Sequence, residues 1–476
     1  MANLVERIAA HPGGATAVVA ADATVTYGQL IDRAAERQRS MDEQGIRRGD
    51  RVAIVAAPTA DFVATYLAVL ASGATAVPLN PGSPAAELDR QLAVVEPALV
   101  LESGESVDPG EAPSGGGGSS SLRIAPVDPT DAAVLMFTSG TAGPPLAATL
   151  THANLVANID QLGQLPGWQL QASDVVYGGL PLFHVFGLNA VLGLALVNGV
   201  AVVLDPRFHA GPSLALLAEH AVTVVAAVPS MWQSWLVESA AGTETRGAWE
   251  RVRIAVSGAA PLPEAVAVEV RRRFGVRLDQ GYGLTETAPV VTTSIGRPAK
   301  PGSIGRPLPG VEIRLVDADG ADAFVGDEGE ILVRGPNVFA GYWHDEGATA
   351  AVFTTDGWLR TGDMAVADDD GDLFLVGRLK ELVIVSGFNV YPAEVEAVLA
   401  SHPGVEDVAV IGIADDHTGE AVKALVVPVA GVELDIDDLR AFAGARLARY
   451  KCPASVVLVP ELPRGATGKV VRRALR

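Results

Sequence analysis

Short runs rich in Val, Ile and Leu alternate with helix-like segments through the first half of the chain. Residues 51–57 have the pattern of a strand, 61–72 that of a helix and 74–79 that of the next strand. Further strand and helix pairs follow at 174–178 and 187–197, 222–228 and 231–238, and 252–257 and 264–274. This alternation is typical of β-α-β units, whose helices cover the faces of a parallel sheet. It predicts an α/β fold with one or two doubly wound parallel sheets.

The length of the chain and the change in its secondary-structure pattern predict two domains. The chain has 476 residues, which is too many for one hydrophobic core when a domain holds about 100–200 residues. After residue 296, short strands separated by Gly, Pro and Asp predict a small β-barrel, and strand and helix alternation resumes near Lys380. We therefore predict a large N-terminal domain, 1–379, of doubly wound sheets plus the barrel, and a small mobile α+β C-terminal domain, 380–476.

Charge and cysteine content limit the partners. Acidic residues number 56 against 35 basic ones, so the net charge is −21, and a chain this acidic repels nucleic acid unless it carries a basic patch. The sequence has no such patch. The one cysteine, Cys452, excludes an internal disulfide, and the N-terminal residues lack the apolar run of a signal peptide, so we expect a cytoplasmic protein. The oligomeric state stays open, a homo-oligomer included.

An uncharged stretch at 185–204 has the length of a membrane-spanning helix. Asn189, Asn198 and several glycines interrupt it, and Gly199 separates a helix-like half from a β-branched half. Strands that are covered on both faces are continuously apolar. We therefore predict a buried helix, a turn and a buried strand, with no stable membrane insertion.

A candidate phosphate-binding loop follows the predicted strand 132–137. The loop reads Thr138-Ser139-Gly140-Thr141-Ala142-Gly143. Glycines let backbone N–H groups approach phosphate oxygens, and the hydroxyl groups add further donors. No Gly-Lys-Ser/Thr follows, so this is not a Walker A loop. Taken alone, the segment is also compatible with an ordinary polar surface loop.

Four later segments favour the phosphate-binding interpretation. The run 280–287 combines Tyr282, glycines, Thr285 and Glu286, a set that can stack on a base and hold magnesium near phosphates. Asp363 follows a turn and is suited to ribose hydroxyls. The third segment contains 377–381 and 386–396, and the fourth ends in Thr467-Gly468-Lys469, where a lysine has few structural reasons to be placed.

These five segments, in this order, resemble the core motifs of the adenylate-forming superfamily, which includes acyl-CoA synthetases, luciferases and peptide-synthetase adenylation domains. The resemblance extends over nearly the whole chain. It implies a two-step ligase in which a carboxylic acid attacks the α-phosphate of ATP and a thiol then displaces AMP. ATP, Mg²⁺ and coenzyme A are therefore the expected cofactor and substrates, and a small carboxylic acid is the expected partner.

The resemblance also assigns roles to residues. Thr138 and Glu286 hold magnesium, and Lys469 bridges the substrate carboxylate and the α-phosphate. Asp363 binds the ribose, Arg378 supports ribose and phosphates, and Lys380 is the hinge. The remaining nucleotide-binding positions are Ser139, Gly140, Thr141, Ala142, Gly143, Gly258, Ala259, Ala260, Gln280, Gly281, Tyr282, Gly283, Leu284 and Thr285. Ser386 and Gly387 are expected to line the pantetheine tunnel, although Gly387 is also compatible with a plain turn.

The acyl pocket is assigned with alternatives. His184, in Pro181-Leu182-Phe183-His184, resembles the gating aromatic residue of the family and is also compatible with a structural histidine. Gly281 and Trp232 complete the expected pocket. Trp232 and Trp235 lie three residues apart on one predicted helix face, so ordinary core packing is an equal alternative for both.

The phosphate loop departs from the family pattern Thr-Ser-Gly-Thr-Thr-Gly-x-Pro-Lys-Gly. Ala142 replaces a threonine, Leu146 replaces the lysine and Ala147 replaces a glycine. A lysine on the β- and γ-phosphates forms charge-assisted hydrogen bonds that leucine cannot form. We therefore predict weaker ATP binding or slower adenylation than in a typical member, without loss of the chemistry.

The leading hypothesis is an AMP-forming acyl-CoA synthetase for a monocarboxylic acid, and a fatty acid is the expected substrate. A malonate-type synthetase is disfavoured because the predicted helix 231–236 supplies no arginine for a second carboxylate. Phe183-His184 stands where amino-acid adenylation domains carry Phe-Asp. The alternatives are an acyl-AMP ligase that passes the acyl group to a carrier protein, and a catalytically impaired nucleotide or acyl binder.

Overall fold

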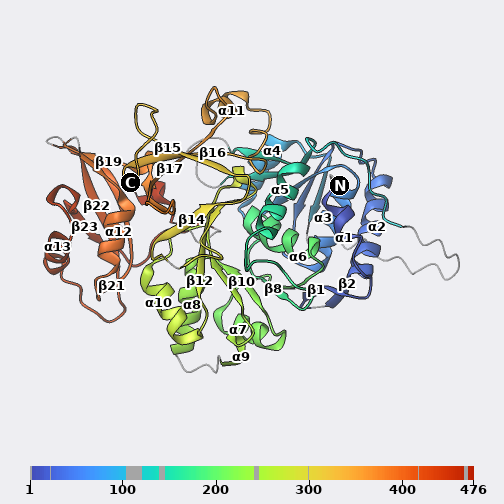
Figure 1. Cartoon of the computed structure of the whole chain (residues 1–476), viewed down its shortest axis with the longest axis horizontal. Helices are drawn as coiled ribbons and strands as arrows, with labels where there is room; N and C mark the ends of the chain where they lie inside the picture. Colours follow the sequence, from blue (N-terminus) through green and yellow to red (C-terminus); the bar gives the residue numbers. More distant parts are fainter. Residues whose placement is uncertain are drawn as a thin grey trace. The chain divides into compact units, whose positions relative to one another are not determined.

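The fold is described from a computed structural model of the chain (Figure 1). The residues described are 3–21, 23–102, 121–138, 145–240, 246–298, 300–386, 388–415, 418–465 and 470–475. They form two compact units, the first made of Met1–Glu312 with Arg334–Gly357, and the second of Ile313–Val333 with Trp358–Arg476. The domain boundary that the sequence predicts near Leu379 concerns domain motion and stays a prediction.

The first unit contains two sheets with parallel centres, as the strand and helix alternation predicts. The smaller sheet has the order β5 (Leu99–Glu102), β3 (Arg51–Val55), β4 (Thr75–Leu79), β6 (Ala132–Phe137) and β7 (Ala147–Thr151). Its pairs are parallel except β6 with β7. Because β6 and β7 are antiparallel, the loop between them forms a hairpin at the carboxyl end of β6.

In the larger sheet of this unit, neighbouring strands follow the order β14 (Ser303–Pro307), β13 (Val290–Thr293), β12 (Leu278–Gly283), β11 (Ile254–Ser257), β10 (Val224–Ala227), β8 (Val175–Gly178), β9 (Ala201–Leu204), β1 (Thr16–Ala20) and β2 (Ala23–Thr26). The strands from β12 to β1 are parallel, and antiparallel strands flank them at both ends. The carboxyl ends of the parallel strands therefore meet along one edge, where ligands bind in open α/β sheets.

The described part of the first unit also contains helices (Figure 1). They are α1 (Leu4–Ile8), α2 (Tyr27–Glu43), α3 (Ala60–Ala71), α4 (Ala85–Val95), α5 (His152–Gly163), α6 (Leu194–Val197), α7 (Ala210–Glu219), α8 (Pro229–Ala240), α9 (Arg246–Trp249), α10 (Glu264–Phe274) and α11 (Glu346–Val352). Every residue of α3 except Asp61 is buried. A helix that is apolar on all sides lies inside a core, and α3 packs against α1, α2 and the strands β3 and β4.

The apolar stretch 185–204 folds as predicted. A π-helix, η1 (Phe186–Gly193), continues into α6, and β9 follows after Gly199. Gly199 has a φ of +72°, so a left-handed turn separates the helix from the strand. None of the helices in the part of the chain that the structure describes has the length and apolarity needed to cross a bilayer.

The second unit combines antiparallel strands with a small α/β layer. Strands β15 (Glu312–Val316), β16 (Glu328–Arg334), β17 (Leu359–Ala367) and β18 (Leu373–Arg378) lie in this order. Among the described residues this row is open, because β15 and β18 are not neighbours, whereas a closed barrel requires its first and last strands to pair. The small barrel that the sequence predicts from 302–316, 329–335 and 373–377 also includes β14, and its closure stays a prediction.

The rest of the second unit is a sheet covered by helices. Its strands are β19 (Val383–Val385), β20 (Phe388–Val390), β21 (Val405–Asp415), β22 (Gly419–Pro428) and β23 (Ser455–Leu458), in the order β20, β19, β22, β21, with β23 paired to β22. Helices α12 (Pro392–Ala400) and α13 (Ile436–Gly444) contribute Val395, Leu399 and Leu439 to its core. Short 3₁₀ turns lie at η3 (Leu379–Glu381), η4 (Arg449–Lys451) and η5 (Arg472–Leu475).

A buried histidine begins helix α5 in the first unit. Thr151 and Asn154 form a capping box there, and His152 is only 1% exposed. Among the described residues, neither of its ring nitrogens has a hydrogen-bond partner. Burial lowers the pKa of His152 to about 4, against an opposing effect of the Asp131 carboxylate and a reinforcing one of the Arg48 charge. The folded protein therefore holds this imidazole neutral.

We expect His152 to make the protein less stable as the pH falls from about 6.5 to about 4, because the unfolded chain binds a proton there and the folded chain does not. A pKa lowered by about 2.5 units corresponds to a loss of up to about 3 kcal/mol, complete near pH 4. The measurement is the free energy of unfolding in urea at pH 7.5 and pH 5 for the wild type and His152→Phe. The exposed His209→Gln serves as control. Equal pH dependence in wild type and His152→Phe would contradict the expectation.

Candidate active site

The residues on either side of the predicted phosphate loop lie at the end of β6 and the start of β7. Phe137 pairs with Ala147, and the backbone N–H of Thr138 donates to the carbonyl of Leu146 at 3.0 Å. Both Thr138 and Leu146 are half-buried. The predictions for Ser139, Gly140, Thr141, Ala142 and Gly143 fall outside the described residues. The structure thus fixes the base of the loop and places Leu146 directly opposite Thr138.

Glu286 lies on η2 (Thr285–Thr287), in a turn that we call the Glu286 turn, residues 284–290. The Tyr342 hydroxyl donates to Glu286 Oε1 at 2.7 Å, and the N–H of Phe339 donates to the Glu286 carbonyl at 2.9 Å. Burial and the Glu286 charge raise the pKa of Tyr342, so this phenol stays a neutral donor. The carboxylate is therefore held in one orientation by a side chain that sequence reasoning did not identify.

The segment after Phe339 joins the Glu286 turn to the phosphate hairpin. The N–H of Ala340 donates to the carbonyl of Thr149 at 3.0 Å, and the N–H of Trp343 donates to that of Ala147 at 2.8 Å. Strand β7 therefore pairs with the chain that carries Tyr342. This connection brings the predicted magnesium residues Thr138 and Glu286 to the same region of the first unit. A carboxylate and a hydroxyl are hard oxygen donors and fit Mg²⁺.

The predicted adenine-binding segments come from neighbouring strands. Ser257 on β11 lies opposite Gln280 on β12, so Gly258, Ala259 and Ala260 follow β11 beside the run from Gln280 to Leu284. A Cβ at Gly258 would lie 3.4 Å from the Gly281 carbonyl oxygen. A Cβ at Gly283 would lie 1.9 Å from the Pro289 carbonyl oxygen, so only glycine fits there. Tyr282 is 8% exposed between these segments.

His184 stands at the start of the helical segment that leads into η1. Its Nδ1 accepts the backbone N–H of Phe186 at 3.2 Å, which places the proton of a neutral ring on Nε2. The Phe186 ring approaches Gly258, since a Cβ there would meet its Cε1 at 3.1 Å. His184 therefore precedes an element that lies close to the end of β11, and its role as a gate stays a prediction. π-helices frequently mark functional sites.

Trp232 and Trp235 on α8 are fully buried, each 0% exposed. Their rings are 5.0 Å apart, and Trp249 lies 5.6 Å from Trp232 and 5.3 Å from Trp235. Trp235 also donates to the Ser213 hydroxyl at 2.7 Å. Both tryptophans are therefore packed in the core, which is the alternative that the sequence left open for them. Trp232 presents no exposed surface to an acyl group in this structure.

The other predicted site residues lie in the second unit. Asp363 on β17 pairs with Arg378 on β18, with Asp363 Oδ1 3.0 Å from Arg378 Nε, so these two candidates are brought together. Lys380 on η3 and Ser386 are exposed, and Ser386 has a left-handed φ of +51°. The predictions for Gly387 and Lys469 fall outside the described residues.

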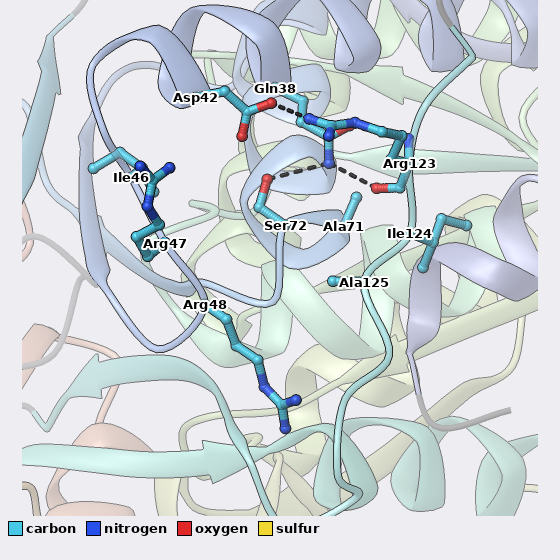
Figure 2. Close-up of a pocket in the computed structure, with 10 residues that line it drawn as sticks. All are labelled: Gln38, Asp42, Ile46, Arg47, Arg48, Ala71, Ser72, Arg123, Ile124 and Ala125. Atoms are coloured by element: carbon cyan, nitrogen blue, oxygen red, sulfur yellow. Dashed lines mark hydrogen bonds and ion pairs between the residues drawn. The ribbon is translucent and has the colours of Figure 1, made fainter.

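A surface pocket in the first unit lies apart from all of these residues (Figure 2). It is lined among others by Gln38, Asp42, Arg48 and Arg123, none of which is a predicted site residue. Arg123 pairs with Asp42, and Arg48 pairs with Asp131. Figure 2 shows the side chains of Arg48 and Arg123 directed apart, so they do not converge on one ligand position.

Sequence reasoning also missed several buried amides around the Glu286 turn. Asn154, Asn158 and Gln161 on α5 are 7%, 0% and 3% exposed. Their spacing of four and three residues gives a polar stripe on one helix face, which usually faces water. The local sequence of α5, with apolar residues on its other positions, gives no signal that this polar stripe is the buried one.

Comparison with known proteins identifies the family of this chain. A family model described as AMP-binding enzyme matches residues 4–343, and one described as AMP-binding enzyme C-terminal domain matches residues 394–469. A feruloyl-CoA synthase from Amycolatopsis sp is 37% identical over 97% of this chain and 95% of its own length. A long-chain-fatty-acid–CoA ligase from Bacillus subtilis (strain 168) is 37% identical over 74% of this chain and 63% of its own length. The structure of ATP-bound MatB from Rhodopseudomonas palustris has a TM-score of 0.91 at 32% identity, covering 100% of this chain and 98% of that one.

The chain therefore belongs to the AMP-binding enzyme family, within the adenylate-forming superfamily that its motifs resemble. In that family it is one of the acyl-CoA synthetases and ligases, which act through an acyl-adenylate. The predicted superfamily, the acid–thiol ligase class and the α/β fold with a smaller C-terminal part are confirmed.

Proposed function

We propose that this protein is an ATP-dependent ligase that joins a monocarboxylic acid to coenzyme A through an acyl-adenylate, with Mg²⁺. The observation that carries the proposal is the connection of the Thr138 hairpin to Glu286 through Tyr342, beside the strands that present Gly258 and Gln280. This arrangement provides oxygen ligands next to a glycine-lined place for a nucleotide. The cytoplasm is the proposed location, on the single Cys452.

The proposed chemistry brings two anions together, the carboxylate of the acid and the polyphosphate of ATP. Bound at Glu286 and Thr138, Mg²⁺ would supply charge neutralisation on the phosphates. Lys469 places its ammonium where negative charge develops on the α-phosphate, and such preorganised charge stabilises a transition state. Asp363 accepts the ribose hydroxyls while Arg378 fixes its carboxylate. The residues Ser139 to Gly143 of the phosphate loop bind the β- and γ-phosphates.

The second half-reaction is proposed to follow a rotation of the C-terminal domain about Lys380. The exposed position of Lys380 on the short η3 is compatible with a hinge, since few buried contacts oppose its movement. Ser386 and Gly387 would then line the pantetheine tunnel. His184 is proposed to move aside when the thiol approaches the acyl-adenylate.

The acyl group is proposed to be compact and uncharged, of the size of an aromatic acid. The sequence favoured a fatty acid, but the space around α8 is filled by an aromatic cluster in which Trp232 and Trp235 are fully buried. This packing leaves the two indoles no surface for a long chain. Identity to the feruloyl-CoA synthase also extends over 97% of this chain, against 74% for the long-chain fatty-acid ligase.

The test is pyrophosphate release and thioester formation with a panel of acids. Ferulate, coumarate, benzoate, acetate, octanoate and palmitate are each supplied with MgATP, with and without CoA. We expect release that CoA stimulates, acyl-CoA as the product, and at least tenfold higher kcat/KM for an aromatic acid than for palmitate. A preference for palmitate would overturn the compact acyl group. Release without thioester would indicate an acyl-AMP ligase that serves a carrier protein, and no release would indicate an impaired binder.

Leu146 gives a separate prediction about ATP. The Leu146 side chain is half-buried opposite Thr138, so a lysine there starts at the base of the phosphate loop. We expect Leu146→Lys to lower the KM for ATP about tenfold, since a hydrogen bond to a charged group contributes about 1.5–3 kcal/mol. Pyrophosphate release against ATP concentration measures this, with Leu146→Met as the control of similar size. An unchanged KM and rate in Leu146→Lys would show that the missing lysine is immaterial here.

A further inference from the structure

The Glu286 turn is surrounded by buried carboxamide side chains. Asn158, Asn189 and Asn337 are 0%, 1% and 0% exposed, and each bonds directly to the backbone of this turn. They come from three separate places, namely α5, η1 and the segment after β16. Burying a carboxamide costs free energy unless its polar atoms are hydrogen-bonded, so a cluster of buried amides around one short turn is unusual.

Each of these amides satisfies backbone groups that the turn cannot satisfy itself. Asn337 Nδ2 donates to the carbonyls of Thr287 at 2.9 Å and Val290 at 3.1 Å. Asn158 Nδ2 donates to the Val290 carbonyl at 2.8 Å, and its Oδ1 accepts the Val290 N–H at 3.1 Å. The carbonyl of Ala288 is left for the third asparagine.

Asn189 reaches that carbonyl from the helix that follows His184. Its Nδ2 donates to the Ala288 carbonyl at 2.8 Å and to the Leu155 carbonyl on α5 at 3.2 Å. One amide group thus joins η1, α5 and the Glu286 turn. Ala288 has a left-handed φ of +62°, a conformation that favours glycine, so the turn needs external contacts to hold its shape.

Stability alone does not account for an asparagine at this position. Within the described part of the chain, the Oδ1 atom of Asn189 is buried and has no hydrogen-bond partner. A Cβ at Gly193 would lie 3.0 Å from this oxygen, so the site is closely packed. An unsatisfied buried oxygen is destabilising, so the favourable contribution of this amide lies in the two hydrogen bonds that its Nδ2 group donates.

We propose that Asn189 is a positioning residue for the nucleotide and magnesium site. By tying η1 to the Ala288 carbonyl, it fixes the turn that carries Glu286 and connects that turn to the element that begins after His184. The carboxylate keeps one orientation because Tyr342 holds the Glu286 side chain, and the three asparagines hold the backbone of the turn that follows it. Their partners in the turn are Thr287, Ala288 and Val290. This inference rests on the proposed function in assigning ATP and Mg²⁺ to Glu286.

The matched pair for the test is Asn189→Leu and Asn198→Leu. Leucine is close to asparagine in size, but it leaves the Ala288 carbonyl without its donor. Asn198 lies on the same apolar segment and donates to the local Leu194 carbonyl at 2.7 Å. Asn198 is exposed, so its replacement controls for the loss of an amide from the same segment, without contact to the Glu286 turn. Thermal unfolding of each variant establishes that it is folded.

Two measurements on the full chain follow, neither of which requires turnover. Calorimetry gives the Kd of ATP with 5 mM Mg²⁺ and with EDTA, and hydrogen–deuterium exchange follows the backbone of residues 284–290. For Asn189→Leu we expect about a tenfold weaker Kd in magnesium, since groups that orient a metal ligand contribute about 10- to 100-fold in affinity. We expect less than a twofold change in EDTA and faster exchange in the turn. Asn198→Leu should resemble the wild type in every measurement.

An equal loss of ATP affinity with and without magnesium would overturn the proposal and make Asn189 purely structural. Unchanged affinity and exchange in folded Asn189→Leu would overturn it as well. If Asn189→Leu gives no cooperative unfolding transition, Asn189→Ser takes its place with the same expected results, because its hydroxyl is too short to reach Ala288. A wild type that binds MgATP but releases no pyrophosphate with any acid would refute the proposed ligase function and leave this test intact.

Discussion

Replacing Lys469 with alanine should reduce pyrophosphate release about 100- to 1000-fold, the usual effect of removing one preorganised group that stabilises transition-state charge. The loss should appear in kcat, since the ammonium acts where charge develops on the α-phosphate and in the attacking carboxylate. The KM for ATP should change less, because Thr138, Glu286 and the other proposed nucleotide contacts remain. Single-turnover formation of the acyl-adenylate, with the preferred acid of the panel, measures the step directly.

The control for this variant is Lys423→Ala. Lys423 is a half-buried lysine on β22 of the same unit, and the adenylation chemistry assigns it no role. The Lys423→Ala variant should form the acyl-adenylate at the wild-type rate. If preformed acyl-adenylate and CoA are supplied, Lys469→Ala should still form thioester at near the wild-type rate, because the lysine serves only the first half-reaction. Pyrophosphate release at the wild-type rate in Lys469→Ala would remove this residue from the mechanism.

Glu286→Gln should reduce kcat/KM about 100-fold and raise the magnesium concentration needed for half-maximal rate. Glutamine keeps the shape of the side chain and can still accept the hydrogen bond that Tyr342 donates at 2.7 Å. What it loses is the negative charge, and a neutral amide is a poorer ligand for a hard divalent cation. Pyrophosphate release against Mg²⁺ concentration, at fixed ATP, is the measurement.

Tyr342→Phe provides a graded comparison for Glu286→Gln. It leaves the carboxylate charged but removes the hydroxyl that orients it, so the magnesium requirement should rise about tenfold, as for other groups that orient a metal ligand. Glu286→Gln should exceed this effect, because it changes the ligand itself. A magnesium dependence that is the same in all three proteins would mean that Glu286 holds no metal.

The fold was largely predictable because its signals are local in the sequence. The runs at 51–57, 61–72 and 74–79 became β3, α3 and β4 within a few residues, and helix α10 has the bounds expected for it. The apolar stretch 185–204 divided at Gly199 into helix and strand as its residues predicted. The expected barrel stays a prediction, since closure depends on which distant strands pair and no local pattern specifies that.

The candidate site was predictable where the residues of one motif act together. The glycines near Gln280 and the Asp363 and Arg378 pair were identified from short segments, and the structure brings each group together. Trp232 was ambiguous because an aromatic residue on a helix face fits a pocket and a core equally. Only the position of Trp249, from another helix, decided between the two.

The sequence by itself determined the parallel-sheet architecture, the adenylate-forming motifs and their order, because each depends on residues that are neighbours along the chain. The tertiary structure alone decided which side chains hold those motifs in place. Tyr342 reaches Glu286 across 56 residues, and Asn189 reaches Ala288 across 99. A hydrogen bond depends on distance and direction in space, and side chains so far apart in sequence acquire both only when the sheets, η1 and α5 have packed.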